Sequence, residues 1–315
     1  MTPLGTGKRS PLDWTLFVIL TCLWASAYPC TRLAVSAGAP ELGLPPEVVT
    51  SARLTLGAII LLIAAFATRQ TWPPLKDVKR WGAMCVMGLV GTAAPFYVIT
   101  TAQKTVDSSL AALYVAASPL FVAALAHFFF KDERMTWRKA LGLVIGFGGV
   151  AILFGPEAVR GIGSASTVAQ ALCLLGTLFY TIHTILARGA PSMPPIVLSA
   201  GFVTFGAISS WFGLITVDFA SLNPQPSAIL GVIGLGIGPT ALASMLYMQL
   251  VARTSATFLS LTGYTIPVVS ALIGFLAFGE VQSWHAIIAF LFILAGVWVS
   301  QQSGKSKSRP VTEDA

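Results

Sequence analysis

The side chains that could do chemistry in this chain of 315 residues are few, and two of them stand inside long apolar stretches. His183 is the one titratable group within such a stretch that could exchange a proton near neutral pH. Arg53 carries a guanidinium that could clamp a carboxylate through two parallel hydrogen bonds. Each residue has a structural alternative. A histidine can be hydrogen-bonded between helices, and an arginine can cap carbonyls or extend its charged end outward to water.

The acidic residues do not stand in the middle of the apolar stretches. The acidic residues nearest to the apolar stretches lie at the ends of these stretches or in turns, namely Asp13, Glu47, Asp107, Glu133 and Glu280. Proton-coupled exporters of cations usually need a buried carboxylate that binds either the proton or the cation. Its absence from the sequence favours passage of neutral or zwitterionic solutes without proton coupling. An enzyme inside a membrane would need a catalytic dyad, paired acids or an HExxH motif, and the sequence contains none of these.

Aromatic and hydroxyl side chains within the apolar stretches are the candidates for lining a substrate cavity. Such side chains can stack on apolar groups and hydrogen-bond the polar end of an amino acid. The alternative is that they pack between helices. The candidates are Trp24, Ser26, Tyr28, Tyr97, Tyr114, Ser118, Tyr180, His183, Tyr247, Thr262 and Tyr264.

No cofactor and no metal is expected. A GxGxxA pattern begins at Gly146, but it lies inside an apolar stretch rather than between a strand and a helix, so the context for binding a dinucleotide is missing. Gly142, Gly146 and Gly149 instead predict a face of small residues for close helix packing. The four cysteines form no CxxC motif and are interpreted as small core residues.

The composition predicts a membrane protein. The chain is 55% apolar and 10% charged, with a mean hydropathy of +0.80, which leaves too little polar surface for a soluble protein of this size. Apolar runs of about 20 residues, the length of a helix that crosses the bilayer, are separated by short charged segments. We predict ten spans at 12–36, 47–67, 81–102, 108–130, 138–154, 167–187, 195–217, 227–251, 255–278 and 283–301.

The positive charges predict the orientation. With both termini in the cytoplasm, fifteen of the nineteen Lys and Arg residues lie on the cytoplasmic side. These basic residues are spread over several short loops, so they do not indicate a nucleic-acid surface. The first apolar run and the Ala25-Ser26-Ala27 that follows it resemble a signal peptide, but the apolar character continues to Val35. We therefore interpret this run as the first span.

The sequence contains an internal repeat. Residues 45–59 align without gaps on 194–208 with seven identities, Tyr97 aligns on Tyr247, and Pro119 aligns on Pro267. Arg53 stands opposite Phe202, and Tyr28 stands opposite His183. Each copy holds five spans, an odd number, so the second copy must be inverted. Inverted repeats are typical of secondary transporters with a binding site near the middle of the membrane.

The two aligned prolines are candidate hinges. Each removes a backbone N–H from an apolar helix, so the carbonyl four residues earlier loses its helical partner. Bending at Pro119 would open the cavity to one face of the membrane, and bending at its inverted counterpart Pro267 would open it to the other face.

Several of these features together resemble the EamA type of the drug/metabolite transporter superfamily. They are the Leu-Trp-Ala-Ser of the first span, the Pro-Pro turn leading to Arg53, and the proline helices that run to Glu133 or Glu280 and then to a Gly-Val pair. The resemblance covers nearly the whole chain. Members export amino acids, other metabolites or toxic organic compounds, and include a bacterial exporter of aromatic amino acids.

The resemblance implies an all-α integral membrane fold of ten helices, in two inverted repeats around a central cavity. The expected domains are a cytoplasmic tail (1–11), the first repeat (12–154), a periplasmic connector (155–166), the second repeat (167–301) and a second cytoplasmic tail (302–315). It implies an exporter or bidirectional facilitator of amino acids or similar metabolites in the bacterial inner membrane. Its partners would be a small-molecule substrate and the lipid bilayer, with no nucleic acid and no obligatory protein partner. The alternatives are a proton-coupled efflux protein for drugs or organic compounds and, less in keeping with the residues, a membrane enzyme or scaffold.

Overall fold

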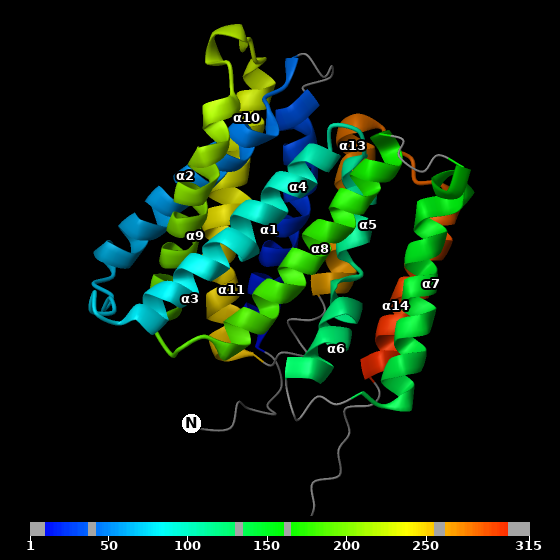
Figure 1. Cartoon of the computed structure of the whole chain (residues 1–315), viewed down its shortest axis with the longest axis horizontal. Coiled ribbons are helices and arrows are strands. Elements are labelled where there is room, and N and C mark those ends of the chain that lie inside the picture. Colours follow the sequence, from blue (N-terminus) through cyan, green and yellow to red (C-terminus); the bar gives the residue numbers. More distant parts are fainter. Residues whose placement is uncertain (1–9, 37–41, 130–134, 161–164, 255–261, 302–315) are drawn as a thin grey trace, which may run out of the picture.

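The computed structural model describes residues 10–36, 42–129, 135–160, 165–254 and 262–301, and every regular element in these ranges is a helix (Figure 1). Two of the elements, η2 and η5, are π-helical and two, η3 and η4, are 3₁₀ turns. In chain order the elements are α1 (Pro11–Ser36), α2 (Pro46–Ala67), α3 (Val78–Gly88), η2 (Leu89–Ala93), α4 (Ala94–Ala102), α5 (Ser108–Val115), α6 (Ser118–Phe129), α7 (Trp137–Arg160), α8 (Ala165–Gly189), α9 (Pro195–Trp211), η3 (Phe212–Thr216), η4 (Phe219–Ser221), α10 (Pro226–Leu235), η5 (Gly236–Leu242), α11 (Ala243–Arg253), α13 (Thr262–Phe278) and α14 (Trp284–Gln301).

Seven helical stretches in the described ranges are long and apolar enough to cross a membrane. They are Pro11–Ser36, Pro46–Ala67, Val78–Ala102, Ser108–Phe129, Ala165–Ala187, Pro195–Thr216 and Pro226–Tyr247, and two shorter apolar helices cover Thr265–Phe278 and Trp284–Ser300. The predicted all-helical membrane fold is confirmed at this level, and the count of ten crossings stays a prediction. Nine of the predicted spans fall on these stretches. The span predicted at 138–154 falls on α7, which continues to Arg160, six residues beyond the predicted end. Residues 255–261 of the predicted ninth span lie outside the described ranges.

Two of the predicted spans contain a π-helical segment, in which the helix is locally wider. Pro95 follows η2 closely, and Pro239 lies inside η5. Proline lacks the N–H of the helical ladder and crowds the carbonyl four residues before it, so the chain widens at these places. The repeat alignment that places Tyr97 on Tyr247 puts η2 on residues 239–243, which overlap η5. Such π segments are frequent at functional sites.

The helix that the sequence predicted over 108–130 is two helices in the structure. Helices α5 and α6 are joined by a turn at Ala116 and Ala117, just before Pro119. The N–H of Ala117 donates to the carbonyl oxygen of Tyr114 at 3.1 Å, three residues earlier, which closes a tighter turn than an α-helix has. In contrast, α13 passes through Pro267 without interruption. The two aligned prolines therefore have different local structures.

Long helices from the two parts of the sequence pack in pairs. Helix α2 packs on α9, and α7 packs on α14. Helix α1 packs on α10 and α13, while α8 packs on α4, α5 and α6. In Figure 1 the pair α7 and α14 stands at one side of the molecule and the group of α2, α3 and α9 at the other, with α1, α4, α5 and α8 between them.

The α7 and α14 pair approaches closely because small residues face each other. Of the predicted Gly142, Gly146 and Gly149, the first and last meet α14, whereas a Cβ added to Gly146 would meet Leu120 Cδ1 of α6. A Cβ atom added to Gly142 would lie 2.5 Å from the carbonyl oxygen of Gly296, and one added to Gly149 would lie 2.7 Å from that of Ala289. A Cβ added to Gly148 of the same helix would meet nothing within 4 Å. We call the contact of Gly142 and Gly149 with α14 the glycine seam.

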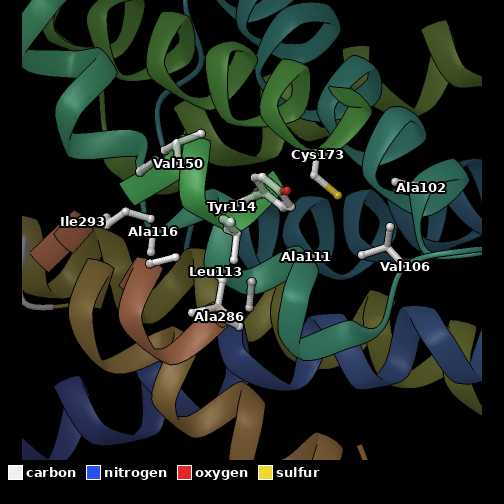
Figure 2. Close-up of a cluster of buried hydrophobic side chains, with 14 of the residues drawn as sticks. Ala102, Val106, Ala111, Leu113, Tyr114, Ala116, Val150, Cys173, Ala286 and Ile293 are labelled. Atoms are coloured by element: carbon white, nitrogen blue, oxygen red, sulfur yellow. The ribbon is translucent and has the colours of Figure 1, made fainter. Parts of the chain in front are cut away.

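A buried apolar cluster fills the space between α5, α7, α8 and α14. Tyr114 of α5 is fully buried in it, and the other three helices contribute Cys173, Val150 and Ile293 (Figure 2). The cluster joins the α7 and α14 pair to the rest of the bundle.

Candidate functional site

A buried arginine stands at the centre of the candidate site. Arg53 lies two turns into α2, a helix that begins at Pro46, and its side chain is 4% exposed. Its Nε and Nη2 atoms donate to Thr240 Oγ1 of η5 at 3.3 and 3.1 Å. Its guanidinium carbon lies 3.9 Å from the ring centre of Phe96 in α4, a cation–π contact. The π segments η2 and η5 thus adjoin the residues that hold this charge.

Two tyrosines complete the surroundings of Arg53. Tyr28 of α1 and Tyr180 of α8 lie close enough to interact with its charge. The Tyr180 ring meets the Phe96 ring edge to face, with the centroids 6.3 Å apart. We call Tyr28, Arg53, Phe96, Tyr180 and Thr240 the arginine cluster. It draws side chains from α1, α2, α4, α8 and η5, and so from both parts of the sequence repeat.

His183 lies one turn beyond Tyr180 in α8. Its ring meets the Phe202 ring edge to face, with the centroids 5.3 Å apart. Its Nδ1 atom is buried with no hydrogen-bond partner in the described part of the chain, and it occupies the space that a side chain at Gly91 would need. His183 is thus packed against Phe202 of α9 and Gly91 of η2.

Six further predicted residues are spread over α1, α6, α11 and α13. The rings of Trp24 and Tyr247 are in contact, with centroids 5.3 Å apart. Thr262 is buried at the start of α13. Ser26 donates to the carbonyl oxygen of Leu23 at 2.8 Å. Ser118 begins α6 half-buried, and Tyr264 lies in α13 with a side chain outside the described residues.

Two of the predicted tyrosines have other partners. The Tyr114 hydroxyl bonds Gln170 inside the apolar cluster of Figure 2. The Tyr97 hydroxyl donates to Glu47 Oε1 at 2.9 Å, and the Tyr97 side chain is 40% exposed. Glu47 also lines a hollow of about 190 Å³ with Pro45, Thr216, Val217, Asp218, Ser221 and Leu222. The structure therefore brings neither Tyr114 nor Tyr97 to the arginine cluster.

A polar network that the sequence did not predict joins the loop after α13 to the start of α5. Glu280 accepts hydrogen bonds from the backbone N–H groups of Ser108 and Ser109, at 3.2 and 3.1 Å. It also accepts from their hydroxyl groups, at 2.8 and 2.7 Å. A carboxylate at a helix N-terminus satisfies N–H groups that have no partner within the helix and complements the helix dipole. The Asp107-Ser108-Ser109 run was the available sequence signal, since such residues favour helix starts.

Asp107 and Arg32 extend this network to α1. The Asp107 carboxylate lies 3.5 Å from the Arg32 guanidinium, whose Nη1 also donates to the carbonyl oxygen of Gln103 at 3.0 Å. Partial burial and the nearby charge of Glu280 raise the pKa of the Asp107 carboxyl, whereas Arg32 acts to lower it. The Gln103 side chain in turn donates to the carbonyl oxygen of Tyr28 at 2.9 Å, so the network reaches the arginine cluster. We call Arg32, Gln103, Asp107, Ser108, Ser109 and Glu280 the Glu280 network.

Comparison with known proteins gives consistent results. The model of the EamA-like transporter family matches the chain at residues 13–155 and again at residues 167–301. The uncharacterized transporter YdfC of Bacillus subtilis is 26% identical over 283 residues, which cover 87% of this chain and 86% of that protein. A probable terminal-alkyne amino-acid exporter of Streptantibioticus cattleyicolor is 27% identical over 302 residues, which cover 92% of this chain and 93% of that protein.

Two further relatives cover almost the whole chain. The uncharacterized inner membrane transporter YedA of Escherichia coli is 26% identical over 315 residues, which cover 97% of each chain. A solved crystal structure with 23% sequence identity has a TM-score of 0.63, with 94% of this chain and 99% of that chain covered, so the two share a fold. The helices mark the chain as a multi-pass membrane protein. Because the family model matches most of the sequence, the chain belongs to the EamA-like transporter family.

Proposed function

We propose that this protein is a secondary transporter that exports, or passes in both directions, amino acids or similar small metabolites across the bacterial inner membrane. The observation that carries the proposal is the arginine cluster, a buried polar and aromatic site to which α1, α2 and α4 contribute from one part of the sequence and α8 and η5 from the other. Sites formed between two halves of a transporter are exposed to either side as the halves move. The amino-acid exporter among the relatives supports this substrate class.

The mechanism we propose is alternating access between two inverted halves of five helices, 12–154 and 167–301, with both termini in the cytoplasm. The helix pairs α2 with α9 and α7 with α14 support it, because each pairs an element with its counterpart in the sequence repeat. The π segments η2 and η5 support it as well, because they overlap when the two copies of the sequence repeat are aligned.

Energy coupling is the next part of the proposal. In the described helices, Asp13 and Glu47 lie in first turns and Glu157 lies in the last turn of α7. The Asp13 carboxylate accepts a hydrogen bond from the N–H of Ser10 at 3.0 Å, at the start of its own helix. In the described ranges no acid forms an ion pair with Arg53, and the groups that act on its charge are Tyr180, Cys30 and Tyr28. We therefore expect facilitated exchange of neutral or zwitterionic solutes. The second candidate, proton-coupled efflux of organic compounds, would need a titrating group, for which the sequence offers His183, one turn beyond Tyr180 in α8.

Flux into proteoliposomes made from pure protein tests the proposal. Counterflow of labelled amino acids should exceed that of protein-free vesicles and should not require a pH gradient. Phe96→Leu should raise the half-saturation concentration, because it removes a ring that contacts Arg53 and Tyr180. Phe275→Leu is the matched control, since Phe275 is 54% exposed on α13. Absence of flux for every amino acid would refute the substrate class, and uptake driven only by a pH gradient would favour the efflux candidate.

A further inference from the structure

The charge of Arg53 is buried without an acidic partner. The two ion pairs in the described ranges, Arg32 with Asp107 and Arg80 with Asp77, lie elsewhere. The groups that interact electrostatically with Arg53 are the phenols of Tyr28 and Tyr180 and the thiol of Cys30, which are neutral at physiological pH in their ordinary state. An unpaired buried charge is strongly unfavourable, so proteins keep one in a membrane-spanning segment chiefly where function uses it.

The two structural roles open to Arg53 do not account for it. Its hydrogen bonds in the described part of the chain go to the hydroxyl of Thr240, so it does not cap the carbonyls of a broken helix. Its side chain does not extend to the surface, because only 4% of it is exposed. In the repeat alignment its counterpart is Phe202, an apolar residue, so the packing of α2 against α9 requires no charge at this position.

Several hydrogen-bonding groups at and around Arg53 have no partner within the described ranges. Within the described ranges, its Nη1 atom and the hydroxyl groups of Tyr28 and Tyr180 make no hydrogen bond. These groups belong to three helices, α1, α2 and α8, and both phenols lie close enough to Arg53 to interact with its charge. A carboxylate can accept from both Nη atoms of a guanidinium and still accept from neighbouring hydroxyls.

The charge and the rings limit the ligand. One cation with neutral neighbours balances one negative charge, which matches a carboxylate better than a doubly charged phosphate. The face of Phe96 borders the guanidinium, and the Tyr180 ring meets Phe96 edge to face, so the two rings offer an apolar surface to the rest of the molecule. We propose that Arg53 binds the carboxylate of a small solute that carries one carboxylate and an apolar side chain. This inference rests on the proposed transport function and names the substrate group that this site recognises.

Three probes that share a benzyl group test the inference with the full-length protein. L-Phenylalanine has a carboxylate and an amine, 3-phenylpropanoate has the carboxylate alone, and L-phenylalaninamide has no carboxylate. Thermal stabilisation of the protein in detergent and counterflow in proteoliposomes are measured for each probe. The variants are Arg53→Met, Arg53→Lys and Thr240→Val, and the control is Arg80→Met, which removes a half-exposed arginine at the start of α3.

Both carboxylates should bind to the wild-type protein, and the amide should bind about 30-fold or more weakly, because it leaves the buried charge unpaired. Arg53→Met should lose binding of the carboxylates by a similar factor, and Arg53→Lys should lose about tenfold, since lysine cannot form the bidentate pair. Arg53→Met should also be at least as heat-stable as the wild type without ligand, because an unpaired buried charge has been removed. A merely structural arginine would give the opposite change in stability.

Equal binding of the amide and the acid, or carboxylate binding retained by Arg53→Met, would overturn the inference. If Arg53→Met fails to fold, its role is structural unless Arg53→Lys and Thr240→Val both fold and selectively lose carboxylate binding. Failure of the transport proposal is distinguishable. Protein that moves no solute but is stabilised by the carboxylates retains the Arg53 site, whereas protein that moves the amide as well as the acid retains transport and loses the site.

Discussion

The glycine seam between α7 and α14 makes a quantitative prediction. A Cβ added by Gly142→Ala would lie 2.5 Å from the carbonyl oxygen of Gly296, whereas an ordinary contact begins at 3.4 Å. The helices must therefore separate by about 0.9 Å at this point, and overpacking of this kind typically costs about 1–3 kcal/mol. Replacing glycine by alanine within a helix returns up to about 1 kcal/mol. The nearest atom is a backbone oxygen, so the cost lies near the upper end of that range, and we expect a net loss of about 2 kcal/mol in the free energy of unfolding.

Gly148→Ala is the matched control, because it makes the same change on the same helix where nothing lies within 4 Å. It should be neutral or slightly stabilising. Unfolding followed by tryptophan fluorescence in mixed micelles compares the two variants with the wild type. The double variant of Gly142 and Gly296 should lose less than the sum of the single changes, because the first substitution already separates the helices. Equal stability of Gly142→Ala and Gly148→Ala would show that the two helices do not meet at this seam.

Three further predictions concern the Glu280 network, the prolines and the histidine. Glu280→Gln should lower the free energy of unfolding by about 1.5–3 kcal/mol, because it replaces charge-assisted bonds to Ser108 and Ser109, and stability equal to wild type in the unfolding assay would contradict the network. Pro119→Ala should slow transport more than Pro267→Ala does, with little change in substrate affinity. The reason is that the helix is interrupted before Pro119 and continuous through Pro267. Unchanged transport rates in both variants would exclude the hinge. His183→Gln should leave counterflow insensitive to an imposed pH gradient, as in the wild type, and loss of gradient-driven accumulation in this variant would assign the proton to His183.

The sequence predicted the helices well because apolar length and helix-breaking residues are local properties. Helix α2 begins at Pro46 and α9 at Pro195, close to the predicted ends, since proline is favoured in the first helical turn. The glycines at 142 and 149 were recognisable from their spacing along one face of a helix. The turn before Pro119 was not predicted, because the same proline in α13 is accommodated without a break.

The candidate site could be predicted only in part. Arg53, Tyr28 and Tyr180 were recognisable because polar or aromatic groups are informative within an apolar stretch. Thr240 and Phe96 were missed, because Thr and Phe are ordinary residues of apolar helices and only the fold brings them to Arg53.

Residues far apart in sequence explain the other omissions. Glu280 and Ser108 are separated by 172 positions, and no local pattern connects them. Tyr97 and Tyr114 were proposed for the cavity on residue type alone, and the structure gives them Glu47 and Gln170 as partners.

The partners of the first-half helices have a consequence for how the chain is made. Helices α2 and α7 are synthesised before their partners α9 and α14. The N–H groups of Ser108 and Ser109 likewise have no Glu280 carboxylate to bind until that residue has left the ribosome. The first half therefore enters the bilayer before its partner helices exist. Lipid or the insertion machinery must cover its unpaired contact surfaces during synthesis. Assembly is completed from the C-terminal end, so a chain cut short before Glu280 lacks stabilising contacts in its first half as well as its last helix.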